Sequence, residues 1–328
     1  VSSQNAGRGP PPRGRPRTRT AAAGRGHRHR RPGPGGGPGV PDPPRGGGGG
    51  RAAGRQPASA APAGPAGQGA SADPARLVAE EIRARGGEAV AHDGDIATDE
   101  GARSLVTTAL ETYGRLDALV NNAGFLRDRM LVNLGEDDWD AVVRVHLKGH
   151  FLPLRHAAAH WRARAKAGSV PEARVVNTTS GAGLLGSVGQ ANYAAAKAGV
   201  VALTLVAAAE LARYGVQVNA VAPAARTRMT ERVFAEAMAA PEDGGFDAMA
   251  PANVSPLVAW LASADAAGVT GRVFEAEAGR ITVMEGWHPG PTADKGDRWT
   301  PGEAGKAVRE LLLRARTEGP VYGTGREV

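Results

Sequence analysis

The amino-acid composition changes sharply near residue 74, and this change confines the fold to the rest of the chain. Residues 1–74 contain no Leu, Ile, Met, Phe, Trp or Tyr, and their only larger aliphatic side chains are Val1 and Val40. Such a segment buries too little apolar surface to offset the entropy lost on ordering. We therefore expect a disordered Arg/Gly/Pro-rich tail over residues 1–74, a folded domain over residues 75–285, and a C-terminal extension over residues 286–328.

The net charge divides at the same place. Residues 1–74 hold twelve Arg, no Lys and two Asp, a net charge of +10, whereas the whole chain carries +7. Residues 75–328 therefore carry −3, so the high isoelectric point belongs to the tail. A mildly acidic domain gives no reason to expect nucleic acid as its partner. An arginine-rich tail that binds nucleic acid through counterion release remains an alternative function.

Cysteine usage and hydropathy limit the class of protein further. The chain has no cysteine, which excludes disulfides, thiolate catalysis and cysteine metal sites and suits a reducing cytoplasm. No metal is expected. We find no uninterrupted run of about 18 apolar residues, the length that would indicate a membrane span.

After residue 74, short apolar runs alternate with segments of helical periodicity. This alternation predicts an α/β fold, a Rossmann-type doubly wound parallel sheet with helices on both faces. In such sheets, ligands bind beyond the carboxyl ends of the strands. The predicted strands are residues 88–96, 116–120, 174–177, 216–221 and 273–276, and the predicted helices begin at residues 73 and 99 or cover residues 136–167, 192–214, 254–263 and 304–316.

Tyr193 and Lys197 lie four positions apart, and Ser180 lies thirteen positions before the tyrosine. Residues at i and i+4 share one face of a helix, so the phenol and the ammonium can point into one pocket. A phenol with a pKa of about 10 is a poor acid or base near pH 7. A cation within about 4–6 Å lowers that pKa and turns the tyrosine into a working acid/base.

Together with the run from Asn121 to Gly124, this spacing resembles the short-chain dehydrogenase/reductase family over about residues 75–286. The resemblance implies a nicotinamide-dependent oxidoreductase that moves a hydride between NAD or NADP, with NAD slightly preferred, and a small-molecule alcohol or carbonyl. It also implies a homo-oligomer that associates through the helices of residues 136–167 and 192–214.

The resemblance assigns a role to each candidate catalytic residue. Tyr193 is the acid/base, while Lys197 lowers its pKa and binds the nicotinamide ribose. Ser180, rather than the adjacent Thr179, holds the substrate oxygen. His146 stands where most members of the family carry an Asn that supports a proton-relaying water. The alternatives are a half-buried helix tyrosine, a solvated lysine, and an imidazole that only bonds backbone groups.

The same resemblance indicates the cofactor contacts. Two positions flank the adenine, three form the turn under the adenine ribose, and three lie near the nicotinamide. Asn121 has a structural alternative, since this turn also stabilises the central sheet. Asp95 and Ile96 are the positions that flank the adenine. Asn121, Ala123 and Gly124 form the turn under the adenine ribose, and Asn219, Pro223 and Thr227 lie near the nicotinamide.

Several stretches resemble one branch of the family, the (3R)-hydroxyacyl-CoA dehydrogenase module of multifunctional enzymes and its bacterial relatives. They are residues 190–193, 222–223, 228–230, 258–261 and 271–275. This branch implies a 3-hydroxyacyl thioester as substrate, carried on CoA. Arg226 and Arg228 are candidates for a CoA phosphate contact, and the alternative is a solvated basic pair.

The beginning of the expected fold is missing from the sequence. A dinucleotide-binding sheet opens with a strand, a glycine-rich turn and a helix whose N-terminus receives the pyrophosphate. The nearest echo, residues 5–9, is followed by three prolines, and the glycines at 46–50 follow no apolar strand. The first βαβ unit is therefore missing or scrambled, which removes strands from the centre of the sheet.

We predict that residues 10–70 are a shifted-frame translation of GC-rich DNA that once encoded this unit, because such a shift yields Arg, Pro, Gly and Ala. Sequencing codons 1–75 again and translating all three frames is expected to show a Gly-x-x-x-Gly-x-Gly turn between an apolar strand and a helix. If no frame encodes that turn, an inactive or non-folding product becomes the better hypothesis.

Overall fold

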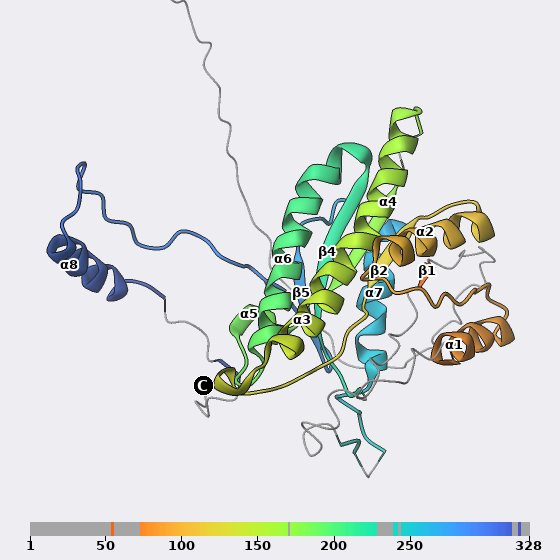
Figure 1. Cartoon of the computed structure of the whole chain (residues 1–328), viewed down its shortest axis with the longest axis horizontal. Coiled ribbons are helices and arrows are strands. Elements are labelled where there is room, and N and C mark those ends of the chain that lie inside the picture. The colour runs from red at the N-terminus through yellow and green to blue at the C-terminus, as the bar shows by residue number, and fades with distance from the viewer. Residues whose placement is uncertain are drawn as a thin grey trace, which may run out of the picture. The chain divides into compact units, whose positions relative to one another are not determined.

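The computed structural model describes residues 54–55, 73–169, 171–227, 239–241, 244–316 and 321–322, all within one unit, Gly49–Val328. Six strands form a single sheet in the order β1-β2-β3-β4-β5-β6. The first five run parallel, and β6 pairs antiparallel with β5. Figure 1 shows the sheet behind the helices α4 (Gly149–Lys166) and α6 (Ala191–Leu211). The strands are β1 (Gly54–Arg55), β2 (Ala118–Asn121), β3 (Ala173–Thr178), β4 (Val216–Ala224), β5 (Val273–Glu277) and β6 (Arg280–Met284).

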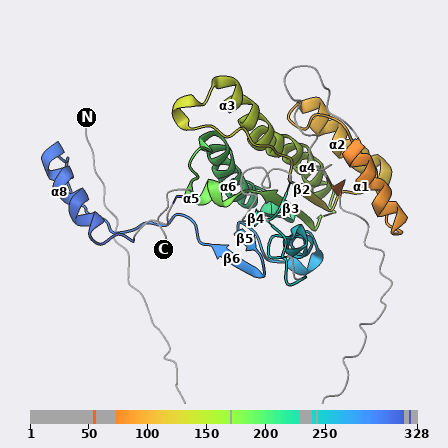
Figure 2. The same cartoon turned by 90° about the horizontal axis from the view of Figure 1, so that it is seen from below.

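Helices cover both faces of this sheet, as the alternating pattern predicts. On one face, α4 contacts β2 and β3 while α6 contacts β4; on the other face, α7 contacts β3 (Figure 2). The helices are α1 (Asp73–Ala84), α2 (Asp99–Tyr113), α3 (Glu136–Val143), α4 (Gly149–Lys166), α5 (Gly181–Leu185), α6 (Ala191–Leu211), α7 (Ser255–Leu261) and α8 (Pro301–Leu312).

The central strands are buried on both sides, which is why they read as continuous apolar runs. On the α4/α6 side, Val175 and Val218 pack with the fully buried Trp161, whose indole N–H donates to the carbonyl of Leu116 at 2.7 Å. On the α7 side, Leu257 and Leu261 pack against Val176 and Val221 of the sheet, among others. The core therefore holds β3 and β4 rigidly beneath the edge where their carboxyl ends lie.

Most of the predicted tail lies outside the described residues, so its disorder and the domain boundaries stay predictions. One part of it does not. Gly54 and Arg55 form β1 and pair in parallel with Leu119 and Val120 of β2. A two-residue strand thus occupies the place beside β2 where the expected fold has its first strand, although the sequence predicts no strand in this segment.

The strand predicted at residues 88–96 does not form; these residues have no regular secondary structure. In a parallel sheet, a strand needs neighbours to satisfy its backbone N–H and C=O groups. The neighbour expected at this place would come from the tail, which has few β-branched and no aromatic residues and contributes only the two-residue β1 to the described part of the sheet. The apolar pattern is present, but its pairing partner is not.

The single helix predicted over residues 136–167 is interrupted. A π-helical segment, Arg144–Lys148, separates α3 from α4. Such wide turns are rare and often occur at functional sites, and this one carries the candidate residue His146. The predictions also missed α5 and the hairpin that adds β6 after β5, while the helix predicted at 304–316 begins earlier, at Pro301, behind a Thr300/Glu303 capping box.

Helix α6 is the described segment that most resembles a membrane span. With the turn that follows it, residues 191–214, it is long and apolar enough to cross a bilayer by length and composition, although its polar residues leave no uninterrupted run of about 18 apolar residues. Its buried face nevertheless carries Asn192, Lys197 and Thr204 and packs on β4. We interpret α6 as a core helix.

Candidate active site

The candidate catalytic residues come from two neighbouring elements at the carboxyl end of β3. Ser180 follows β3 and caps α5, and its hydroxyl accepts a hydrogen bond from the Ala182 N–H at 3.2 Å. Tyr193 and Lys197 lie one turn apart on α6. A Cβ atom at Gly183 would lie 2.6 Å from the Cβ of Lys197, so only glycine lets α5 approach α6 this closely.

The structure distinguishes Ser180 from Thr179, the two residues that the sequence leaves adjacent. Thr179 is buried and donates to the backbone carbonyl of Lys197 at 2.8 Å, which ties β3 to α6. Ser180 instead lies close enough to the side chain of Tyr193 to lower its pKa. The serine hydroxyl therefore lies beside the phenol, and the threonine hydroxyl is committed to the scaffold.

Lys197 is buried almost completely, and its ammonium donates to the Thr178 carbonyl at 2.6 Å. Its Nζ also lies 5.6 Å from the centre of the Tyr193 ring. Burial penalises the charged form of an amine, and it lowers the pKa of Lys197 to about 7. Near pH 7, the Lys197 side chain beside Tyr193 is therefore present as a mixture of ammonium and neutral amine.

The pKa of Tyr193 differs from the expectation. Burial raises this pKa and the nearby Asp128 raises it further, while the hydrogen bond from Ser180 lowers it. A lysine whose own pKa is about 7 is charged only part of the time near neutral pH, so it does not offset the burial of the phenol. Within the chain alone, Tyr193 is therefore a protonated phenol rather than a phenolate.

His146 lies between Phe125 and Tyr193. Its ring meets the tyrosine ring edge-on, with 5.0 Å between centroids, and its Nε2 is 3.0 Å from the Phe125 amide nitrogen and 2.7 Å from the Phe125 carbonyl oxygen. Burial and the charge of Lys197 lower the pKa of His146 to about 3. A neutral imidazole with one nitrogen on the backbone and its Nδ1 unpaired therefore faces the site.

Sequence reasoning missed His150, one turn after His146 on α4. Its side chain is fully buried, and the backbone groups of Thr178 and His146 lie near its ring without satisfying either nitrogen in good hydrogen-bond geometry. Burial, Lys197 and His146 all lower the pKa of His150, so this imidazole is also neutral. The four-residue spacing of the two histidines was the available signal, but the sequence could not show that both point inward.

Asn192 is a second residue that the sequence did not single out. Its buried side chain donates to the carbonyls of Arg127 at 3.1 Å and Asp138 at 3.2 Å, and it accepts from the Tyr193 N–H at 2.8 Å. These bonds fix the first turn of α6 against the loop after β2. These hydrogen bonds therefore fix the backbone position of Tyr193 at the start of α6.

Among the candidate cofactor positions, Asn121 and Asn219 have structural roles. The Asn121 amide donates to the Asn177 side chain at 2.9 Å and to the His150 carbonyl at 3.3 Å. The Asn219 amide donates to the Val269 carbonyl at 2.8 Å, and its oxygen accepts from the Arg272 N–H at 3.1 Å. Both side chains bridge neighbouring elements in the sheet.

The other candidates lie at or near the same edge. Ala123 and Gly124 are buried directly after β2, and Pro223 lies near the end of β4. Ile96 is buried, whereas Asp95 pairs with Arg144 and accepts from the Ala97 N–H at 2.9 Å. Ala123 and Gly124 thus follow β2, Pro223 is among the last residues of β4, and Asp95 and Ile96 end the irregular segment of residues 88–96.

The loop after β4 is described only in part. Thr227 is half-buried there, and Arg228 lies outside the described residues. Arg226 forms an ion pair with Asp247, and both side chains are partly buried, so this arginine is not the solvated cation that the sequence offered as the alternative; its contact with a CoA phosphate stays a prediction.

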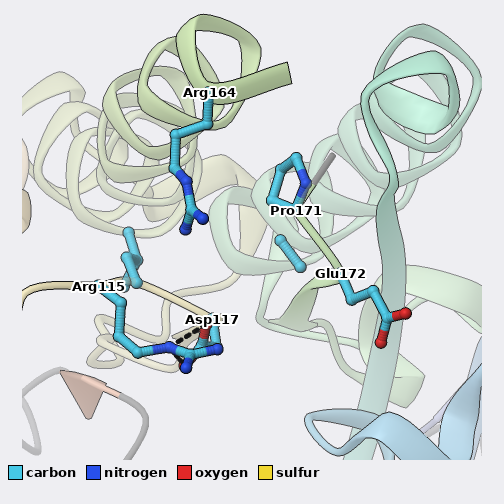
Figure 3. Close-up of a pocket in the computed structure, with 7 residues that line it drawn as sticks. Arg115, Asp117, Arg164, Pro171 and Glu172 are labelled. Atoms are coloured by element: carbon cyan, nitrogen blue, oxygen red, sulfur yellow. Dashed lines mark hydrogen bonds and ion pairs between the residues drawn. The ribbon is translucent and has the colours of Figure 1, made fainter. Parts of the chain in front are cut away.

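A hollow of about 310 Å³ lies at the opposite end of the strands, where β2 and β3 begin. Figure 3 shows Arg115, Asp117 and Arg164 around it, with a hydrogen bond of 2.9 Å from Arg115 to Asp117. Because ligands of parallel α/β sheets bind at the carboxyl ends of the strands, we do not regard this hollow as the active site.

Comparison with known proteins agrees with this geometry. The family profile described as short chain dehydrogenase matches residues 50–237. The chain is 48% identical over 254 residues to the hydroxyacyl-CoA dehydrogenase ChsB1 of Mycobacterium tuberculosis, covering 74% of this chain and 78% of that protein. It is 40% identical over 215 residues to the peroxisomal multifunctional enzyme type 2 of Mus musculus, covering 66% of this chain and 27% of that protein.

A solved structure is similar as well. The crystal structure of a short chain dehydrogenase from Mycobacterium avium is 59% identical to this chain, with a TM-score of 0.70, and the match covers 78% of this chain and 84% of that one. The chain belongs to the short-chain dehydrogenase family. It is an oxidoreductase of a family that uses NAD(P), as its Tyr/Lys spacing predicts.

Gly124 offers a test of how tightly the site is packed. A Cβ atom at this position would lie 2.0 Å from Cε1 of the buried His146, which has Tyr193 behind it. We expect Gly124→Ala to lower the free energy of unfolding by about 1–3 kcal/mol through overpacking, and to reduce kcat. Urea unfolding measures the first quantity and steady-state kinetics the second.

Gly135→Ala is the matched control, because Gly135 has a φ of −80° and a Cβ atom added there would have no neighbour within 4 Å. It is expected to stay within about 0.5 kcal/mol of the wild type, as surface substitutions usually do. Equal stabilities for the two variants would contradict the packing described for His146.

Proposed function

We propose that this chain catalyses the reversible oxidation of a 3-hydroxyacyl thioester by a nicotinamide cofactor, with Ser180, Tyr193 and Lys197 as catalytic residues. The observation that carries the proposal is the meeting of these three side chains at the carboxyl end of β3. Ser180 is close enough to the phenol to lower its pKa, and the buried Lys197 has its Nζ 5.6 Å from the Tyr193 ring centre.

The proton chemistry follows from this arrangement. In the oxidation, Tyr193 Oη accepts the proton of the substrate hydroxyl, and in the reduction it returns a proton to the carbonyl oxygen. Ser180 donates to the same substrate oxygen and keeps it in line with the phenol. Lys197 stabilises the phenolate when its amine is protonated, so a charged lysine and an ionised tyrosine support each other.

The residues around Lys197 fit a nicotinamide ribose. An ammonium has three donors, and the Thr178 carbonyl takes one of them, which leaves donors for a ribose hydroxyl. When bound, the nicotinamide supplies the hydride acceptor or donor. Ala123, Gly124, Pro223 and Thr227, together with Asp95 and Ile96, complete the proposed cofactor contacts. We propose NAD rather than NADP as the preferred cofactor.

Two histidines make the surroundings of the reaction neutral. His146 and His150 both have lowered pKa values because they are buried near Lys197. We propose that His146, whose ring faces Tyr193, accepts or donates a proton through a water in the place of the usual Asn. Its unpaired Nδ1 supports this role.

The substrate class rests on similarity. The names of two relatives describe a hydroxyacyl-CoA dehydrogenase and a peroxisomal multifunctional enzyme, and the branch-specific stretches of the sequence point the same way. We therefore propose an acyl-CoA as the thioester.

The outer faces of α3, α4 and α6 support a homo-oligomer. Phe151, Leu205 and Val206 are 44%, 48% and 55% exposed, and Trp139 on α3 is also partly exposed. A second copy of the chain would cover these apolar side chains. We also propose a cytoplasmic location, which suits a chain without cysteine.

Tyr193→Phe removes the proton carrier and keeps the ring. We expect turnover to fall by about 10²–10⁴-fold or more, the usual contribution of general acid/base catalysis, while the affinity for NADH stays unchanged. Steady-state rates with 3-hydroxybutyryl-CoA and fluorescence titration with NADH measure the two quantities.

Tyr214→Phe, at the far end of the same helical segment, is the matched control and should keep full activity. Retained turnover in Tyr193→Phe would overturn the mechanism. A wild-type protein that binds no NADH would instead support the inactive product.

A further inference from the structure

The C-terminal extension returns to the active site through two residues. Tyr322 pairs with Ser187 in a parallel bridge, in which the Val188 N–H donates to the Tyr322 carbonyl at 2.9 Å and the Tyr322 N–H donates to the Gly186 carbonyl at 3.2 Å. These partners lie in the segment that joins α5 to α6, between the candidate residues Ser180 and Tyr193. The contact therefore forms on the loop that links the helix capped by Ser180 to the helix that carries Tyr193.

Two glycines in this segment make room for the extension. A Cβ atom at Gly181 would lie 2.7 Å from the Tyr322 hydroxyl and 2.9 Å from its Cε2, so the ring rests directly against the Gly181 backbone. A Cβ atom at Gly186 would lie 3.3 Å from Cγ1 of Val321. Any larger residue at position 181, directly after Ser180, would push the Tyr322 ring away from this part of the backbone.

Two carboxylates of β5 lie near the ring. Burial together with the charges of Glu275 and Glu277 raises the pKa of Tyr322. The phenol therefore stays protonated at neutral pH and lies close to both β5 and Gly181. The residue is still 45% exposed, so part of the ring remains accessible beside Gly181.

We propose that Tyr322 is a specificity-determining residue that forms a wall of the substrate site next to Ser180 and limits the space for the acyl chain. The inference rests on the proposed function, since it concerns the thioester that Ser180 and Tyr193 would hold. The backbone bridge to Ser187 holds residue 322 in place, and the ring itself rests against the Gly181 backbone. Such a fixed aromatic face restricts what lies against it.

The test compares Tyr322→Ala with Tyr322→Phe in the full chain, using 3-hydroxybutyryl-CoA and 3-hydroxydecanoyl-CoA as probes. Removing the ring is expected to raise the ratio of kcat/KM for the long over the short probe by about 10-fold or more, the scale on which pocket size discriminates between substrates. Tyr322→Phe keeps the ring and should stay within about 2-fold of the wild-type ratio. The affinity for NADH should be the same in all three proteins.

A double-substitution cycle tests the contact itself. Gly181→Ala should destabilise the wild type and be tolerated better in the Tyr322→Ala background, because the atom it strikes is then gone. An unchanged chain-length ratio in an active Tyr322→Ala protein would overturn the inference and leave the proposed function standing. A wild type that neither turns over nor binds the two thioesters in calorimetry would overturn both.

Discussion

The hydrogen bond from the buried Lys197 ammonium to the Thr178 carbonyl is the interaction on which the site depends. It joins α6 to the carboxyl end of β3, and the Thr179 hydroxyl reinforces the junction by donating to the Lys197 carbonyl. The close approach of α5 to α6 at Lys197 requires a residue without a side chain at Gly183. Because the amine has left water, its pKa falls to about 7. The same packing that forms the junction therefore sets the charge available to Tyr193.

Neutral groups surround this lysine. The π-helical segment carries His146 to the edge of the Tyr193 ring, and His150 lies buried one turn later. Neither imidazole is charged near neutral pH, since burial and the lysine lower both pKa values. Leaving a buried polar group without a partner typically costs about 1–3 kcal/mol. Both rings have nitrogens without a hydrogen-bond partner in the described structure. The unfavourable free energy of these buried groups is therefore concentrated next to the candidate catalytic lysine, as is common at functional sites.

The sequence predicted the parts of the structure that depend on local spacing. A four-residue separation sufficed to place Tyr193 and Lys197 on one face of α6, and the strand-end rule brought Ser180 to them. Sequence-based prediction failed where the outcome depends on contacts between residues far apart in the chain. The strand at residues 88–96 lacks a neighbour to pair with, the pKa of Tyr193 depends on burial, and the inward orientation of His150 depends on how α4 packs. The contact of Tyr322 with Gly181 joins segments that no local pattern connects.

Direct titration of Lys197 is the measurement that tests this site most sharply. In protein labelled with ¹³C-lysine, with Lys197→Met to assign the signal, the Cε resonance is expected to titrate with a midpoint near 7. Because the unfolded lysine titrates near its ordinary value of about 10.4, the unfolded state binds more protons between these values, and the free energy of unfolding should rise as the pH increases from about 7 toward 10. A midpoint near 10.4 would show a solvated lysine and would contradict the buried Tyr193–Lys197 pair.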